Sequence, residues 1–177
     1  MLETVVEKSA EVQPKKALDL GCGPKPRNKF HAEEIFGIDI RDDLSANILA
    51  ADLVTDPIAF PDNHFDFVTA FDFIEHVPRI IYCPQKRAPF VELMNEIYRV
   101  LKPGGLFFSS TPAYPHPAAF QDPTHVNIIT EKTFAKYFDD TTRWAVMYGF
   151  KGHFKLHTQK WREQHLETAM IKVISPE

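Results

Sequence analysis

The sequence predicts an α/β protein with a doubly wound, mostly parallel sheet, helices on both faces and an antiparallel hairpin at one edge. Short apolar runs alternate with helical or loop segments through most of the chain, which is typical of parallel strands joined by crossovers. One strongly amphipathic helix separates two of these runs. Two further runs near the C-terminus, at about residues 152–161 and 165–174, are only a few residues apart and favour a hairpin.

Length and composition place the chain among ordinary globular proteins. Its 177 residues predict a single domain over residues 1–177, since domains usually hold roughly 100–200 residues. Apolar residues make up 44% and charged residues 25%, which excludes disorder or a coiled coil as a description of the whole chain. The net charge of −4 gives no reason to expect nucleic acid as a partner.

Several absences predict a cytoplasmic protein in a reducing compartment. No apolar run approaches the roughly 18 residues that a membrane helix needs, so no membrane association is expected. Residues 1–16 carry glutamates and lysines where a signal peptide would be apolar. Cys22 and Cys83 are too few for a disulfide framework and form no pair with zinc-ligand spacing.

The first half of the chain begins with a short amphipathic helix, predicted over residues 2–12 and ended by Pro14. Four apolar runs then read as strands, and the first of them enters the tight turn Gly21-Cys22-Gly23. The four predicted strands lie at residues 16–20, 34–40, 47–53 and 64–71.

The second half contains the clearest helix, whose apolar residues fall on a single stripe. They are Phe90, Leu93, Met94, Ile97, Val100 and Leu101. Pro89 can start this helix, and Pro103-Gly104-Gly105 cannot continue it. A strand at residues 106–110 follows, then a helix at 131–138 with Thr130 as its N-cap.

Acidic residues and glycines gather where the first three strands end. Parallel sheets bind ligands at the carboxyl ends of their strands. Gly21 and Gly23 let a ligand approach bare backbone, and Asp39 can accept hydrogen bonds from two ribose hydroxyls. Asp52, at the end of the third strand, could receive the exocyclic amine of an adenine. With Asp19 in the first strand, the pattern indicates an adenosine compound.

The first loop favours an adenosine joined to an amino acid over one joined to a phosphate chain. A dinucleotide site would have a third glycine where Pro26 stands, and Pro24 and Pro26 together remove two amide donors. An amino-acid carboxylate needs fewer donors than a pyrophosphate. No Walker lysine loop is present, so nucleotide hydrolysis has no support.

From about residue 17 to 138 the sequence resembles the class I S-adenosylmethionine-dependent methyltransferases, close to the small type 11 group. The resemblance is carried by segments in a specific order: Leu18-Asp19-Leu20-Gly21-Cys22-Gly23, Gly37-Ile38-Asp39-Ile40, Ala51-Asp52-Leu53, Phe60-Pro61-Asp62-Asn63-His64-Phe65-Asp66, Ile74-Glu75-His76-Val77, and the stretch from Glu96 to Gly105. It implies a Rossmann-like sheet of seven strands and S-adenosylmethionine as the cofactor.

The resemblance also implies which residues hold the cofactor. These are Asp19, Gly21 and Gly23 for the methionine part, Asp39 for the ribose, Ile40, Asp52 and Leu53 for the adenine, and the strand end Ala70 and Phe71 for the amino group. The sequence departs from the family pattern at Lys25, where many members have a third glycine, and in a short helix between Pro26 and Phe36.

Two histidines are candidates for proton transfer near the substrate. His76 follows the fourth strand, where the family brings cofactor and substrate together, and His125 lies in a later loop. An imidazole can accept a proton near neutral pH. A histidine that only hydrogen-bonds a neighbouring loop is the favoured alternative for His76, and a structural role is likewise favoured for Glu75.

The proline-rich stretch from Thr111 to His125 leaves a strand at its carboxyl end and is predicted to overhang the site. Its candidate substrate-binding residues are Tyr114, His116, Phe120, Asp122 and His125. The alternative is a rigid loop held by its own Asp-Pro-Thr-His turn. A metal site at His116, Asp122 and His125 matches no known ligand spacing, so no metal is expected.

The sequence therefore predicts an enzyme that transfers the methyl group of S-adenosylmethionine to a small molecule. Three alternatives stay open: a non-catalytic S-adenosylmethionine-binding subunit, a nicotinamide-dependent oxidoreductase and a methyltransferase acting on a macromolecule. The acceptor, its reacting atom and the oligomeric state are not predicted.

Overall fold

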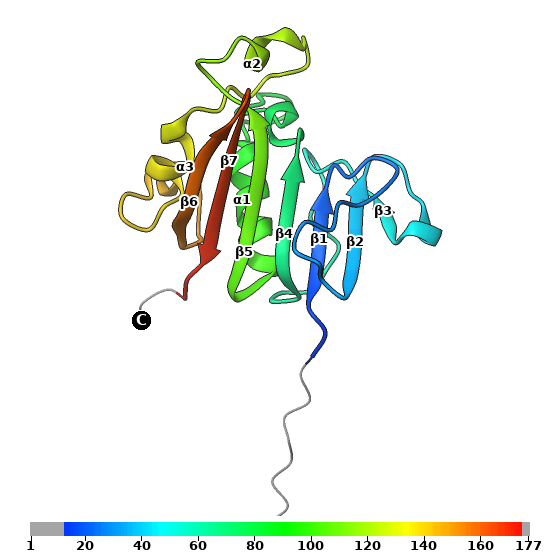
Figure 1. Ribbon diagram of the computed structural model, residues 1–177. Coiled ribbons are helices and arrows are strands. Elements are labelled where there is room, and N and C mark those ends of the chain that lie inside the picture. Colours follow the sequence, from blue (N-terminus) through cyan, green and yellow to red (C-terminus); the bar gives the residue numbers. More distant parts are fainter. Residues whose placement is uncertain (1–12, 175–177) are drawn as a thin grey trace, which may run out of the picture.

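A single seven-stranded sheet organises the protein in the computed structural model, which describes residues 13–174. The strand order is β3-β2-β1-β4-β5-β7-β6. The strands are β1 (Lys16–Leu20), β2 (Glu34–Asp39), β3 (Ile48–Ala50), β4 (Phe65–Phe71), β5 (Leu101–Pro112), β6 (Phe154–Arg162) and β7 (His165–Lys172). The first five are parallel and β7 is antiparallel to both of its neighbours, as Figure 1 shows. This confirms the predicted fold class.

The strand order reverses between β1 and β4, which pair side by side in the middle of the sheet. From β1 the chain proceeds outward to β2 and β3, then returns to β4 and continues to β5 on the other side. A crevice opens outside the carboxyl ends of the strands at such a reversal, because the flanking connections leave in opposite directions. The topology therefore places a ligand site beyond Leu20 and Phe71.

The main core lies on one face of the sheet, beneath α1 (Pro89–Val100) and α3 (Glu131–Tyr137). The rings of Phe90 in α1 and Phe134 in α3 lie 6.3 Å apart, and Phe107 of β5 is fully buried with them. Figure 1 shows both helices behind the sheet. The apolar stripe of residues 90–101 thus faces the core, as its helical spacing predicted.

The opposite face differs from the prediction of helices on both faces. Over residues 13–174 no helix covers that face, and the crossover from β1 to β2 has no helix between Pro26 and Phe36. Phe30 from this crossover stacks on Phe67 of β4 at 4.7 Å and also meets Phe108 of β5. Pro24 and Pro26 lack the amide donors that a helix needs, so an irregular segment fills the helix position.

Two strand predictions had wrong boundaries. The third strand, predicted over residues 47–53, has only the three residues of β3. Asp52 instead accepts a hydrogen bond from the backbone N–H of Val54, the local turn that competes with strand pairing. The strand predicted at 106–110 runs through the whole of β5, because the chain re-pairs with β4 immediately after α1.

Other predicted elements are confirmed. α3 begins at a capping box in which Thr130 and Thr133 satisfy each other's backbone N–H groups, and β6 and β7 form the hairpin. The helix predicted over residues 2–12 lies outside the described residues.

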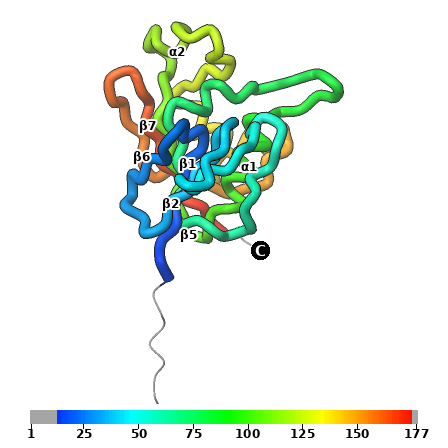
Figure 2. The backbone as a smooth tube through the Cα atoms, turned by 90° about the vertical axis from the view of Figure 1, so that its right-hand side faces the viewer, coloured from blue at the N-terminus to red at the C-terminus, as the bar shows by residue number. Residues whose placement is uncertain are grey.

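The connections at the carboxyl end of the sheet are long. They carry η2 (Ile74–His76) and α2 (Ala118–Gln121). Two other short helices are η1 (Leu44–Ala46), between β2 and β3, and η3 (Trp144–Tyr148), between α3 and β6. Figure 2 shows the α2 connection beyond that end of the sheet, and the segment between η2 and α1 reaching out from the body. None of the helices in residues 13–174 is long and apolar enough to cross a membrane.

Candidate functional site

The turn after β1 presents bare backbone at the reversal point. Gly21 and Gly23 have φ of 63° and 61°, a left-handed conformation that glycine adopts without cost. A Cβ on Gly21 would lie 2.3 Å from Cδ2 of Phe73, so this position also needs glycine for close packing. A Cβ on Gly23 would meet no heavy atom of the described residues within 4 Å. Gly23 therefore borders open space that a ligand can fill.

Asp39 lies at the end of β2 and faces the same turn. Its Oδ2 accepts a hydrogen bond of 2.9 Å from the N–H of Gly23. Its Oδ1 is 3.3 Å from Nε of Arg41, a side chain that is 75% exposed. Because this second contact is long and its arginine is exposed, Oδ1 can exchange it for ligand hydroxyls, although the Asp39 side chain itself is 12% exposed. Ile40, also 75% exposed, offers an apolar surface next to it.

Asp19 has a different surrounding from that predicted. It is 1% exposed, and its two oxygens accept hydrogen bonds of 2.7 Å from Oγ1 of Thr69 and 2.8 Å from the N–H of Arg27. Burial raises the pKa of Asp19, while these hydrogen bonds oppose the rise. Both oxygens thus accept a hydrogen bond inside the protein, which anchors the turn that carries the glycines. A contact of Asp19 with the methionine part of the cofactor stays a prediction.

The predicted adenine contacts lie two and three residues beyond β3. Asp52 is exposed, and its Oδ1 accepts a 3.0 Å hydrogen bond from the N–H of Val54. The Leu53 side chain is 7% exposed and belongs to the core. Leu53 can therefore meet an adenine only through its backbone, whereas the Asp52 carboxylate is open to solvent.

The predicted end of β4 reaches the same edge of the sheet. Ala70 is fully buried between β1 and β5, so only its backbone is available. The ring of Phe71 lies under the guanidinium of Arg27, with 4.8 Å from Cζ to the ring centroid. Strand end and glycine turn are thereby held together.

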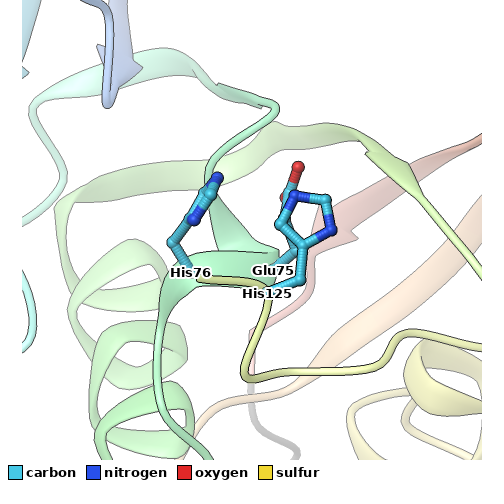
Figure 3. A group of neighbouring side chains, drawn as sticks. All are labelled: Glu75, His76 and His125. Atoms are coloured by element: carbon cyan, nitrogen blue, oxygen red, sulfur yellow. The ribbon is translucent and has the colours of Figure 1, made fainter. Parts of the chain in front are cut away.

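A second cluster lies after β4, as Figure 3 shows. Glu75 and His76 come from η2, and His125 comes from the loop after α2. One possible ligand atom from each side chain lies within 4.8 Å of the others. The two imidazole rings meet edge to face at 4.9 Å. The structure thus brings together both histidines that were predicted as proton-transfer candidates.

Glu75 is the residue of this cluster that the prediction left out of the site. Its backbone oxygen accepts hydrogen bonds from the N–H groups of Val126 and Asn127, which fixes the His125 loop against η2. Its side chain is 1% exposed, and Oε2 accepts a 2.7 Å hydrogen bond from Oγ1 of Thr111. Oε1 is buried without a hydrogen-bond partner in the described part of the chain. Burial raises the pKa of Glu75.

The histidines also make the loop contacts expected of structural residues. Nδ1 of His76 lies 3.0 Å from Oγ1 of Thr124, and Nδ1 of His125 lies 3.3 Å from the carbonyl oxygen of Ala119. Each contact occupies one ring nitrogen and leaves the other available. The surroundings of His76 are therefore compatible both with proton transfer and with a structural role.

The loop predicted as a substrate wall overhangs the carboxyl end of β5, with α2 at its top in Figure 1. Tyr114 and Phe120 are 54% and 58% exposed and form an edge-to-face pair. His116 accepts a hydrogen bond from the N–H of Ala118 through Nδ1, at the start of α2. This loop presents aromatic surface while its histidine supports its own backbone.

Asp122 also bonds within the loop. Its Oδ1 accepts hydrogen bonds from the N–H and the Oγ1–H of Thr124, and these hydrogen bonds lower the pKa of Asp122. The set His116, Asp122 and His125, weighed above as a metal site, is thus not the one that converges. The converging set is Glu75, His76 and His125.

Comparison with protein families decides the assignment. Residues 2–160 match the model of a methyltransferase domain. The chain belongs to this methyltransferase family. S-adenosylmethionine is the cofactor that the family and fold imply, and the open space at Gly23 and the weakly paired Oδ1 of Asp39 suit its amino-acid and ribose parts.

A curated relative of this methyltransferase is sterol 24-C-methyltransferase erg-4 of Neurospora crassa. The two are 32% identical over 109 residues, which cover 52% of this chain and 26% of the relative. The chain thus spans about a quarter of the length of that relative.

Solved structures confirm the fold. An S-adenosylmethionine-dependent methyltransferase from Mesorhizobium loti matches with a TM-score of 0.59 and 15% identity over 93% of this chain and 94% of its own. One from Archaeoglobus fulgidus gives a TM-score of 0.58 and 17% identity over 89% and 86%. The [4+2]-cyclase SpnF gives 0.60 and 15% over 91% and 75%. At such identities the likeness concerns the fold alone.

Proposed function

We propose that this methyltransferase domain transfers the methyl group of S-adenosylmethionine to a small-molecule acceptor. The observation that carries the proposal is the arrangement of Gly23 and Asp39, which meet across the ends of β1 and β2, next to the reversal of strand order between β1 and β4. Gly23 leaves room for the methionine part of the cofactor. Asp39 accepts the ribose hydroxyls, with Ile40 against the adenine.

Alignment is the main contribution of the protein to such a reaction. S-adenosylmethionine, when bound, supplies an electrophilic methyl carbon on a sulfonium. The strand ends hold the donor, while the loop with Tyr114 and Phe120 holds the acceptor behind that carbon. Fixing two reactants in this geometry can supply roughly 7–11 kcal/mol of the barrier.

The acceptor-side groups of the proposal are His76 and His125. Their rings lie together, His76 on η2 after β4 and His125 on the loop that overhangs β5. A group there that takes the proton of an acceptor hydroxyl would add roughly 10²–10⁴-fold to the rate. Tyr114 and Phe120, exposed on the same loop as His125, suit an acceptor with an apolar body.

Two observations support a small-molecule acceptor. A largely apolar cavity of about 400 Å³, in the size range of small-molecule sites, lies between the start of α1 and α3 and is connected to the cluster through Asn127. Asn127 lines this cavity, and its backbone N–H bonds to Glu75. The curated relative is also named for methylation of a small molecule, a sterol.

Calorimetric titration of the purified chain tests the cofactor first. S-adenosylmethionine should bind in one equivalent and NAD⁺ should not, because Pro24 and Pro26 remove donors that a pyrophosphate needs. Tight binding of NAD⁺ alone would overturn the proposal in favour of an oxidoreductase.

Methyl transfer is tested separately. The chain is incubated with isotope-labelled S-adenosylmethionine and a metabolite extract, and label is sought in small molecules by mass spectrometry. Asp39→Ala serves as the matched control. Cofactor binding without transfer to any extract component or macromolecule would support the non-catalytic alternative.

A further inference from the structure

The cluster of Glu75, His76 and His125 contains an unusual buried oxygen. Oε1 of Glu75 has no hydrogen-bond partner in residues 13–174, although the residue is 1% exposed. An ionised carboxylate without full pairing is costly to bury. The single hydrogen bond from Thr111 satisfies only the other oxygen. Oε1 therefore has no hydrogen-bond donor among the described residues.

Hydrogen bonding determines which nitrogen of each imidazole carries its proton. Oγ1 of Thr124 donates to Asp122 at 2.6 Å, so it can only accept from Nδ1–H of His76. The carbonyl oxygen of Ala119 is likewise only an acceptor, so Nδ1 of His125 also carries the proton. In both neutral rings the lone pair then lies on Nε2.

This outer arrangement matches that of metal-binding histidines. A histidine ligand generally donates its other ring N–H to a carbonyl, a carboxylate or a hydroxyl, which orients the ring and increases its basicity. His125 does so directly to Ala119, and His76 does so to Thr124, which is in turn held by Asp122.

We propose that Glu75, His76 and His125 form a binding site for a divalent first-row transition-metal ion. Two imidazoles and one carboxylate suit zinc, iron(II), cobalt(II) or nickel(II), whereas magnesium and calcium prefer oxygen ligands alone. The candidate ligand atoms already lie within 4.8 Å of one another. His125 sits on a partly exposed loop and can close the remaining gap.

Three protein ligands leave coordination positions open, as in catalytic rather than structural metal sites. An oxygen of the acceptor can occupy such a position. This part of the inference rests on the proposed function, since it takes the acceptor side of that reaction. With the ion bound, the histidines act on the acceptor through the ion and not as free bases.

Metal binding is measured on the full chain after treatment with a chelator, without cofactor or acceptor. Co²⁺ is added and its visible absorption followed, and Zn²⁺ is titrated by calorimetry. We expect one equivalent to bind. Because neither measurement uses S-adenosylmethionine, failure of the proposed function would leave this result unaffected, and the reverse also holds.

Variants identify the ligands. Glu75→Gln and His125→Gln should each weaken Co²⁺ binding by more than the roughly 10–100-fold that loss of an outer partner costs. Thr124→Val, which removes an outer partner of His76, should weaken it within that range. His116→Gln is the matched control on the same loop and should leave the affinity unchanged.

Glu75→Gln preserves the shape of the side chain but changes a buried group. If the Glu75→Gln variant fails to fold, His125→Gln on the loop gives a second test. Circular dichroism checks folding in each case. The proposal is overturned if the stripped chain binds neither ion, if the folded Glu75 and His125 variants bind Co²⁺ as wild type does, or if His116→Gln alone abolishes binding.

Discussion

Asp19 and Glu75 are two carboxylates in nearly the same setting, one in the half of the site that we propose for the cofactor and one in the half that we propose for the acceptor. Each is 1% exposed, burial raises the pKa of each, and each accepts a 2.7 Å hydrogen bond from a buried threonine. They differ in the second oxygen. That of Asp19 accepts from the N–H of Arg27, whereas Oε1 of Glu75 has no partner in the described residues.

The hydrogen bonding of the second oxygen distinguishes a carboxylate that supports the fold from one that can still bind a ligand. A carboxylate whose two oxygens both accept hydrogen bonds from the protein is stabilised in its place and holds a loop. A buried carboxylate with one oxygen unsatisfied carries an energetic cost that a bound cation can remove. The family motif contains Asp19, whereas the buried oxygen without a hydrogen-bond partner in the described residues belongs to Glu75.

The largest expected effect is at the glycine turn. Gly21→Ala should lower the free energy of unfolding by overpacking against Phe73, roughly 1–3 kcal/mol, and by backbone strain, roughly another 1–2 kcal/mol. Gly23→Ala, with the same positive φ but open space around it, should show the strain alone. Urea denaturation measures both, and equal losses would contradict the packing difference.

The two threonines compare the carboxylates directly. Thr111→Val should cost about 3 kcal/mol of stability and Thr69→Val about 1.5 kcal/mol, the ends of the range for a hydrogen bond to a charged group. The reason is that Asp19 keeps the N–H of Arg27 when its threonine is lost, whereas the Glu75 side chain keeps no such donor. Chemical denaturation of both variants in metal-free buffer tests this order, which a larger loss for Thr69→Val would reverse.

Asp39 affects ligand affinity more than stability. Asp39→Ala should weaken binding of S-adenosylmethionine by about 1.5–3 kcal/mol, or roughly tenfold to 150-fold, through loss of hydrogen bonds to a charged acceptor. Asp42→Ala changes an exposed carboxylate nearby and should leave the affinity unaltered. Calorimetry on both variants decides, and an Asp39 variant that binds as wild type does would exclude the ribose role.

The smallest effect is a pH dependence from Asp19, whose pKa is raised from its ordinary value of 3.8 by burial. As pH rises through the window above 3.8, the unfolded chain releases this proton before the folded one, so wild-type stability falls. Asp19→Asn cannot ionise and lacks this loss. Its stability deficit relative to wild type should therefore shrink as pH rises across the window, and a deficit that grows would indicate a lowered pKa.

The sequence predicted the strand ends better than the contacts between distant loops. Gly21 follows directly on β1 and Asp39 is the last residue of β2, so local patterns are enough to place both at one edge of a parallel sheet. The absence of a helix after Pro26 was harder to predict from the sequence. Prolines disfavour a helix but do not indicate which structure replaces it. Only the packing of Phe30 on Phe67 reveals the replacement.

The acceptor half depends on contacts between segments about 50 residues apart in the sequence. His76 and His125 looked like separate loop histidines, and Glu75 looked structural. Their convergence follows from the hydrogen bonds of Val126 and Asn127 to the backbone of Glu75. No periodicity or motif in the chain encodes such a pairing.

Residue order alone was sufficient for the strand pattern and the mostly parallel sheet, because hydrophobic period and strand ends are local properties of the chain. The folded molecule added which carboxylate is satisfied, which face lacks a helix and which histidines meet. These features are fixed by burial and by hydrogen-bond partners from distant segments, and only the three-dimensional packing brings such partners within reach.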